Sequence, residues 1–158
     1  MSASRPTMVR VGGLILLLSF GLCGCASIPL QVVSPDGKAV TTIELHPWLR
    51  EHPLSAGQTI RVDELGRSDS ASFHIVQIRT KEPPHVHRTH DLVAVVKQGH
   101  GTLFLGSQQL HLEPGSLVNI PHGVVHAFVN ESRDPAVAFV VFSPPFDGTD
   151  TVPVQNAH

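Results

Sequence analysis

Apolar and polar residues alternate with a period of two from about residue 72 onward, the spacing typical of β-strands. Short apolar or alternating runs recur along this segment, and clusters of Pro, Gly and Asp separate them. The runs are Phe73–Ile78, Leu92–Val96, Thr102–Leu105, Gln108–Leu112, Leu117–Ile120, Val124–Val129 and Ala136–Phe142. No amphipathic segment of helical length competes with them. The pattern therefore predicts an all-β barrel or sandwich over residues 72–146, with Glu82-Pro83-Pro84 as one of its turns.

We predict that residues 25–71 form a leader segment that precedes this domain. Ser34-Pro35-Asp36-Gly37 is a turn signal next to the short apolar run Leu30–Val33, and Pro47 in His46–Arg50 favours one turn of helix. We expect part of the leader to pack on the barrel as edge strands. Residues 147–158 are predicted to form a C-terminal tail.

The first 24 residues have the layout of a bacterial export signal. Arg5 and Arg10 precede an apolar core, Val11–Leu22, that is shorter than the roughly 20 residues a membrane-spanning helix needs. The core ends in Leu22-Cys23-Gly24-Cys25, which resembles a lipobox, where the signal is cut before a cysteine that then carries lipid. A buried N-terminal helix and a secretory signal cut elsewhere are the alternatives.

On this resemblance Cys25 is the lipidated first residue of the mature chain, a position that Cys23 fits less well. Several acyl chains would hold the protein stably on a membrane surface. Ala26 and Ser27 follow Cys25 in place of an aspartate. By resemblance to lipoprotein sorting signals, this favours the outer membrane, with the protein facing the periplasm.

Composition and charge limit the kinds of binding partner that we expect for this protein. The chain has 158 residues, enough for one domain; 41% are hydrophobic and 15% charged, and the formal charge is −2. Loss of the signal would remove two arginines and make the charge more negative, so lipid and not charge would hold the protein at a membrane. The sequence has no basic stripe of the kind that binds nucleic acid, so we do not expect nucleic acid as a partner. Both cysteines lie near the N-terminus, so no disulfide framework is expected downstream. The expected partners are a small-molecule ligand, a membrane through the lipid, and a second copy in a homodimer.

Two segments among the 11 histidines carry the candidate chemistry. In an extended chain residues i and i+2 face the same side, so His85 and His87 can present both imidazoles to one point, and Asp91 has the same parity. The second segment reads Gly115-x5-Pro121-x-Gly123-x2-His126-x3-Asn130. Its Pro121–Gly123 turn would return the chain across the barrel. Two histidines from one strand, a third from another and a nearby carboxylate suit a divalent transition metal such as iron, manganese, zinc or nickel.

The second segment resembles the second motif of the cupin family at every fixed position, and His-x-His followed by Gly99 resembles the first. The likeness covers about 70 residues and implies a small jelly-roll β-barrel with a metal in its open mouth. It places His85, His87 and His126 on the family's three histidine ligands. It leaves Asn130 as a turn residue or a hydrogen-bonding residue that orients a ligand.

The first motif departs from the family in two places. Arg79 stands where the family has Gly, and the glutamate ligand of the family is missing. Counting back from Gly99 puts that ligand on Leu92, which cannot bind metal, whereas counting forward from His87 puts it on Asp91, which can. Either Asp91 completes the site, or three histidines bind the metal with water. The remaining alternative is a metal-free barrel lined by histidines.

Two classes of function follow from this site. In the first, the protein is an enzyme that resembles metal-dependent cupin dioxygenases or isomerases and acts on a small oxygenated molecule. In the second, it is a module that binds a small molecule or metal without turnover. The fold alone does not choose between them.

Overall fold

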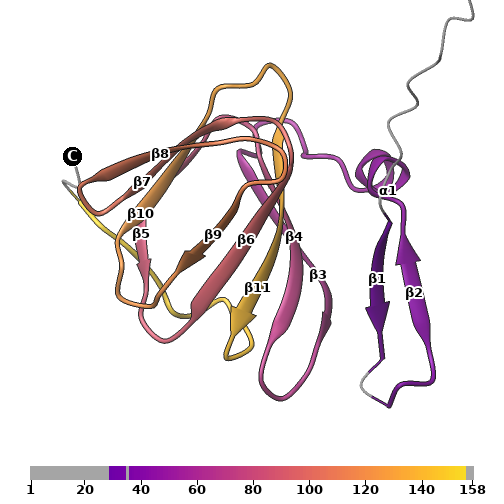
Figure 1. The fold of residues 1–158 in the computed structure, drawn as a ribbon. Helices are drawn as coiled ribbons and strands as arrows, with labels where there is room; N and C mark the ends of the chain where they lie inside the picture. Colours follow the sequence, from indigo (N-terminus) through magenta and orange to yellow (C-terminus); the bar gives the residue numbers. More distant parts are fainter. Residues whose placement is uncertain (1–28, 35, 156–158) are drawn as a thin grey trace, which may run out of the picture.

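Two antiparallel sheets of five strands face each other as a jelly roll in the computed structural model, which describes residues 29–34 and 36–155 (Figure 1). One sheet has the order β12 (Thr151–Pro153), β5 (Lys81–His87), β10 (His126–Asn130), β7 (Gly101–Leu105), β8 (Gln108–Leu112). The other has the order β3 (Ile60–Arg67), β4 (Ser72–Ile78), β11 (Ala136–Ser143), β6 (Asp91–Gln98), β9 (Leu117–Ile120). The predicted all-β barrel is confirmed, but it extends beyond the predicted bounds of 72–146, because β3 comes from the predicted leader and β12 from the predicted C-terminal tail. The predicted signal and its lipidated Cys25 lie outside the described residues.

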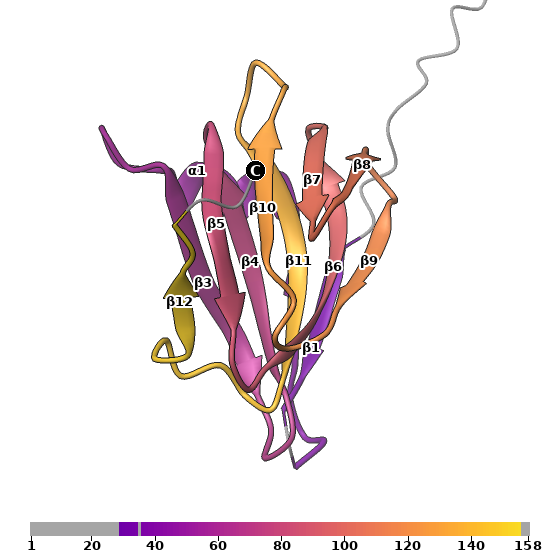
Figure 2. The same cartoon turned by 90° about the vertical axis from the view of Figure 1, so that its left-hand side faces the viewer.

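The core fills the space between the two sheets. Figure 2 shows the sheet that contains β5 and β10 in front of the other sheet. Alternate residues of each strand point inward, as the period of two requires. Leu103 and Phe128 come from one sheet and Val76, Val140 and Phe142 from the other, and all five are buried. The interior is therefore mainly apolar; its buried polar side chains include Ser72 and His74 on β4 and the histidines described below.

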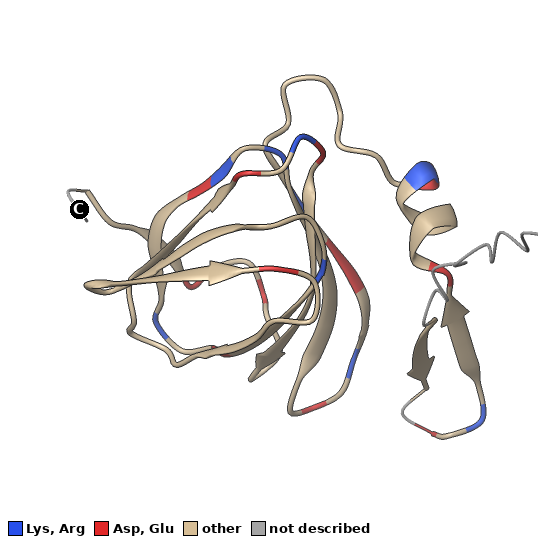
Figure 3. Ribbon diagram, turned by 45° about the horizontal axis from the view of Figure 1, so that its top comes forward, with Lys and Arg blue, Asp and Glu red and all other residues tan. Residues whose placement is uncertain are grey.

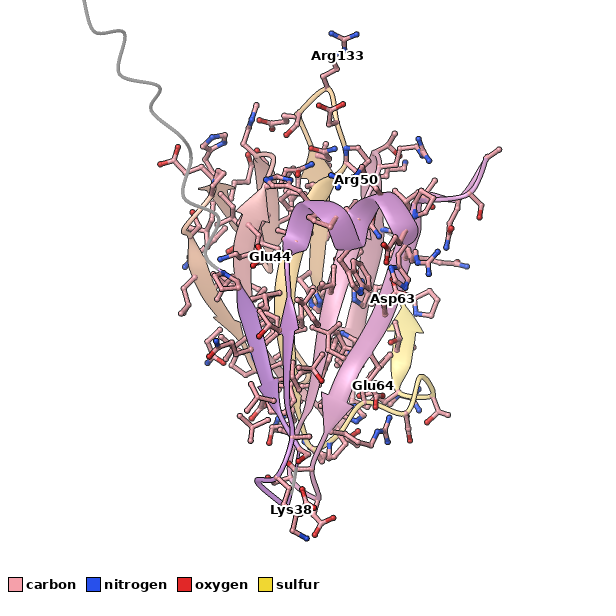
Figure 4. All side chains as sticks on the ribbon, turned by 90° about the vertical axis from the view of Figure 1, so that its right-hand side faces the viewer. Lys38, Glu44, Arg50, Asp63, Glu64 and Arg133 are labelled. Atoms are coloured by element: carbon pink, nitrogen blue, oxygen red, sulfur yellow. The ribbon has the colours of Figure 1, made fainter. Side chains whose placement is uncertain are left out.

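The first part of the predicted leader forms a second, smaller layer outside the barrel, whereas its last part, β3, is an edge strand of the barrel. Strands β1 (Leu30–Val33) and β2 (Val40–Ile43) make a hairpin with Lys38 near its tip, and the helix α1 (Leu45–Glu51) follows (Figure 4). Ile43 and Leu45 are buried against Ile75 and Val137, which point away from the barrel interior. The hairpin and helix thus cover the outer face of the β3–β4–β11–β6–β9 sheet.

Each of the seven predicted strand segments contains a strand within about two residues of the expected bounds, and the helical turn around Pro47 is present as α1. The interpretation of Glu82-Pro83-Pro84 as a turn was wrong, because these residues lie inside β5. Opposite them, β10 pairs His126 with His85 but Phe128 with Glu82, so β5 carries one extra residue. This β-bulge tolerates prolines, which have no N–H to donate to a regular ladder.

Positions of charged residues of both signs are spread along the ribbon, as the colours of Figure 3 show. No helix in the described part of the chain is both long and apolar enough to cross a bilayer.

Candidate metal centre

Three buried histidines meet inside the barrel at the side of β5 and β10. His85 and His87 lie on β5, and His126, the first residue of β10, is the cross-strand partner of His85. Their ring centroids are 4.2 Å apart for His85 and His126, 5.0 Å for His85 and His87, and 5.4 Å for His87 and His126. One nitrogen from each ring lies within 4.8 Å of the other two. The structure thus brings the three predicted histidine ligands together.

Each of these rings uses its Nδ1 atom as a hydrogen-bond donor. His85 Nδ1 donates to the Pro83 carbonyl at 2.9 Å, and His126 Nδ1 donates to the Val124 carbonyl at 3.0 Å. Since a carbonyl only accepts, these rings carry their proton on Nδ1, which leaves the Nε2 lone pair free. His87 Nδ1 lies 3.3 Å from Oδ1 of Asp150, a carboxylate that also only accepts. All three rings are thus held in the tautomer that binds metal through Nε2.

Burial keeps two of the rings neutral. Desolvation lowers the pKa of His126 to about 4, and the neighbouring His85 and His87 rings act in the same direction. Desolvation also lowers the pKa of His87, although its hydrogen bond to Asp150 opposes the shift. A histidine must be neutral to bind a metal, so both rings are in the binding form near neutral pH.

The turn before β10 is tied directly to the first histidine strand. Gly123, with φ of +77°, donates its N–H to the carbonyl of His87 at 2.7 Å. A left-handed φ of this kind is easy only for glycine. Together with Pro121, Gly123 thereby reverses the chain so that His126 returns beside His85.

Asp91 stabilises that same turn and is not brought to the histidines. Its Oδ1 atom accepts from the backbone N–H of His122 at 2.8 Å and contacts His122 Nδ1 at 2.6 Å. The Asp91 side chain is 54% exposed, and the His122 bonds lower its pKa. Asp91 therefore lies outside the group that the three histidines form, and the geometry does not support it as the fourth ligand.

Asn130 is a turn residue at the far end of β10. The two hydrogens of its amide nitrogen are shared among the carbonyls of Ile78, Arg79 and Asp134, and its oxygen accepts from the backbone N–H of Ser132. These bonds hold the end of β10 to the connection between β4 and β5. Asn130 therefore shapes the barrel and does not orient a histidine ring.

An apolar cavity of about 90 Å³ adjoins the histidines, several times the space that one water needs. His87, His126 and Glu82 supply its polar lining, and Leu92, buried in the core, lies on its wall. Leu92 thus occupies the interior position that counting from Gly99 gave to the family's glutamate. Among the described residues that line the cavity, Glu82 is the only acid. Burial raises the pKa of the Glu82 carboxyl.

Sequence reasoning missed Asp150, which approaches the site from the C-terminal segment. Asp150 is 8% exposed, and its Oδ2 atom accepts from the backbone N–H groups of Thr89 and His90 and contacts His90 Nδ1. Its Oδ1 atom contacts His87. Asp150 precedes β12, which pairs with His85–His87, so this edge strand places the carboxylate behind a ligand. The contact joins residues 63 positions apart, and no local pattern predicts it.

His90, Asp147 and Asp150 form a second group with the spacing of metal ligands, but His90 has no free nitrogen in it. Its Nδ1 atom faces Asp150, and its Nε2 atom lies 3.0 Å from the carbonyl of Pro145. Two acceptors on one ring are the environment of a doubly protonated imidazolium. These bonds raise the pKa of His90 against the desolvation that opposes them. The group is therefore an ion pair and not a metal site.

The residues of the first group fit a divalent transition metal. Three neutral imidazoles with free Nε2 atoms and fixed Nδ1 partners are the donor set that such ions prefer. Three protein ligands leave coordination positions open, and the adjoining cavity gives a small molecule access to them.

Comparison with known proteins identifies relatives of the barrel. The model of a family described as Cupin domain matches residues 72–142. An uncharacterized protein of Aquifex aeolicus (strain VF5) is 38% identical over 98 residues, which is 62% of this chain and 80% of that protein. The structure of KdgF from a Halomonas species matches with a TM-score of 0.55 and 25% identity, over 62% of this chain and 91% of that one.

A second solved structure, TT1209 from Thermus thermophilus, matches with a TM-score of 0.55 and 23% identity, over 63% of this chain and 95% of that one. At this identity the likeness describes the fold alone. The segment matched by the family model contains both strands that carry the histidines, β5 and β10.

Proposed function

This chain belongs to the cupin family, and from that premise we propose that it is a lipid-anchored periplasmic protein that binds a divalent transition metal through His85, His87 and His126. One observation carries the proposal. All three Nδ1 atoms are held by oxygen acceptors while the rings converge, which leaves three Nε2 lone pairs for one ion. A histidine that merely lined a core would need no such common tautomer.

We propose further that the metal site acts on a small oxygenated molecule. When bound, the metal supplies Lewis acidity toward an oxygen of the ligand or a site for molecular oxygen. The chain's own residues hold and surround that ligand. Leu92 and the other apolar side chains of the cavity exclude water from its body, while Glu82 and the histidines offer the polar contacts.

Metal analysis of the purified barrel-containing protein tests the site. The wild-type protein is expected to bind about one equivalent of metal, whereas His85→Ala and His126→Ala variants lose most of it. His111→Ala is the matched control, because His111 has a side chain 58% exposed on β8. Equal metal in all four proteins would overturn the assignment.

A non-catalytic binding module is the second candidate. Apart from Glu82, His87 and His126, the described residues that line the cavity are apolar, so they offer few groups that could transfer a proton to a ligand. Oxygen uptake by the iron-loaded protein with a panel of thiols, diketones and phenols separates the two. Uptake with any of them supports an enzyme, and none with the whole panel supports the binding module.

A further inference from the structure

The bulge in β5 turns Glu82 toward the inside of the barrel. Glu82 and His85 are three residues apart, so in a regular strand they would face opposite sides of the sheet. The extra residue at Pro83-Pro84 shifts the alternation by one, since His85 is opposite His126 while Glu82 is opposite Phe128. His126 and Phe128 are both buried and share one face of β10. Glu82 therefore shares the face of the histidines.

The Glu82 carboxylate lies close to one ring of the histidine cluster, that of His85. Its Oε1 atom lies 3.8 Å from Nε2 of His85, the nitrogen that is free to bind metal. Two donors that are each about 2.1 Å from one ion are at most about 4.2 Å apart, so the observed separation is compatible with a shared ion. Glu82 is not in the group whose donor atoms all lie within 4.8 Å of one another, so its carboxylate must turn about its three side-chain bonds to reach an ion held by all three rings.

Neither of the two positions where the family's glutamate ligand was expected supplies a carboxylate to the histidines. The interior position that resembles the family's glutamate slot is Leu92, which cannot bind an ion, and Asp91 is occupied with His122 on the outside. Glu82 lines the cavity between the histidines and the apolar wall. The Glu82 side chain is 25% exposed, so its carboxylate is partly desolvated, and a divalent cation would supply the charge that pairs with it.

We propose that Glu82 is the fourth protein ligand of the metal, so that this chain replaces the family's glutamate after the His-x-His motif with one that precedes it. The inference rests on the proposed metal site. It predicts an ion with three imidazole ligands and one carboxylate ligand, all four from the paired strands β5 and β10.

Cobalt(II) binding to the full-length protein tests the proposal, by visible absorption and by competition with a chelator. Substitution of a residue that only orients a metal ligand typically weakens metal affinity by about 10–100-fold. Glu82→Gln would remove a ligand itself, so it should weaken cobalt binding at least tenfold and alter the cobalt spectrum. Glu113→Gln, in the exposed turn between β8 and β9, is the matched control and should bind like the wild type. Asp91→Asn should keep the wild-type spectrum.

The outcomes separate the two proposals. No cobalt binding by the wild type would overturn the proposed function itself. If His126→Ala abolishes cobalt binding but Glu82→Gln keeps the affinity and spectrum of the wild type, only the role of Glu82 is overturned. A cobalt spectrum that changes in Asp91→Asn alone would overturn that role as well. If Glu82→Gln does not fold by circular dichroism, a crystal structure of the zinc-loaded wild type decides. A Glu82 oxygen about 2.0–2.2 Å from the ion supports the proposal, and one beyond about 3 Å contradicts it.

Discussion

A histidine ring has two nitrogens, and the partner of one decides what the other can do. His87 and His90 lie three residues apart and share the carboxylate of Asp150, yet they differ in this respect. His87 has its acceptor on Nδ1 and lies among two other rings, whereas His90 has acceptors on both nitrogens. The same carboxylate therefore orients the neutral ring of His87, a candidate metal ligand, on one side and pairs with the cationic ring of His90 on the other.

Substitution of Asp150 by asparagine should weaken metal binding by about 10–100-fold, the usual effect of losing a carboxylate behind a metal-bound histidine. The reason is that Asp150 fixes the Nδ1–H tautomer of His87 and holds the strand β12 against β5. Affinity measured by chelator competition checks the prediction.

Asp147→Asn provides the control for this change. Asp147 is exposed in the same loop, and an asparagine keeps the side-chain oxygen that accepts from Thr149. Affinities that stay equal in the two folded variants would contradict a role for Asp150 in positioning His87.

At the scale of elements, strands could be predicted where residues alternate and turns where Gly and Pro cluster. The interior side of a strand could be predicted only while the alternation is regular. The bulge at Pro83-Pro84 breaks it, so parity counted along the sequence assigns Glu82 to the wrong face. β12 pairs with β5 from far along the chain, and a strand of three residues leaves no periodic signal. The three histidines could thus be predicted, whereas Glu82 and Asp150 could not.

Strand β7 approaches β10 so closely that a side chain at Gly101 does not fit. A Cβ atom there would lie 2.1 Å from the Val129 carbonyl oxygen and 2.7 Å from the Phe128 ring. Gly101→Ala should therefore destabilise the protein by about 1–3 kcal/mol or more, because the backbone of β10 must move. Thermal unfolding monitored by circular dichroism measures the loss.

Gly66→Ala on β3 is the comparison for that variant, because its nearest neighbour would be a methyl carbon of Val32 at 3.1 Å, which can move more easily than backbone. The Gly101 variant should melt at the lower temperature. The opposite order would show that β7 and β10 can separate at little cost.

At the scale of the whole molecule, the two sheets have different surroundings. The β3–β4–β11–β6–β9 sheet is covered on its outer face by the β1–β2 hairpin and α1 (Figure 1). The three histidines of the candidate metal centre belong to β5 and β10 in the other sheet. The proposed lipid-bearing Cys25 is five residues before β1 in the sequence. A lipid there would join the membrane to the chain through the covering layer, and the histidine strands would not take part in anchoring.

Anchoring and metal binding should therefore be separable. Cys25→Ser is expected to abolish incorporation of radiolabelled palmitate and to move the protein from the membrane fraction to the soluble fraction. Because His85, His87 and His126 lie on β5 and β10, the soluble variant should bind metal with the affinity of the wild type. Cys23→Ser is the control, since the lipobox spacing favours Cys25, and this variant should still be labelled. Labelling that persists in Cys25→Ser would place the anchor elsewhere. If the wild type is labelled, and Cys25→Ser is unlabelled and has also lost its metal, the layer formed by the β1–β2 hairpin and α1 would instead be needed to support the site.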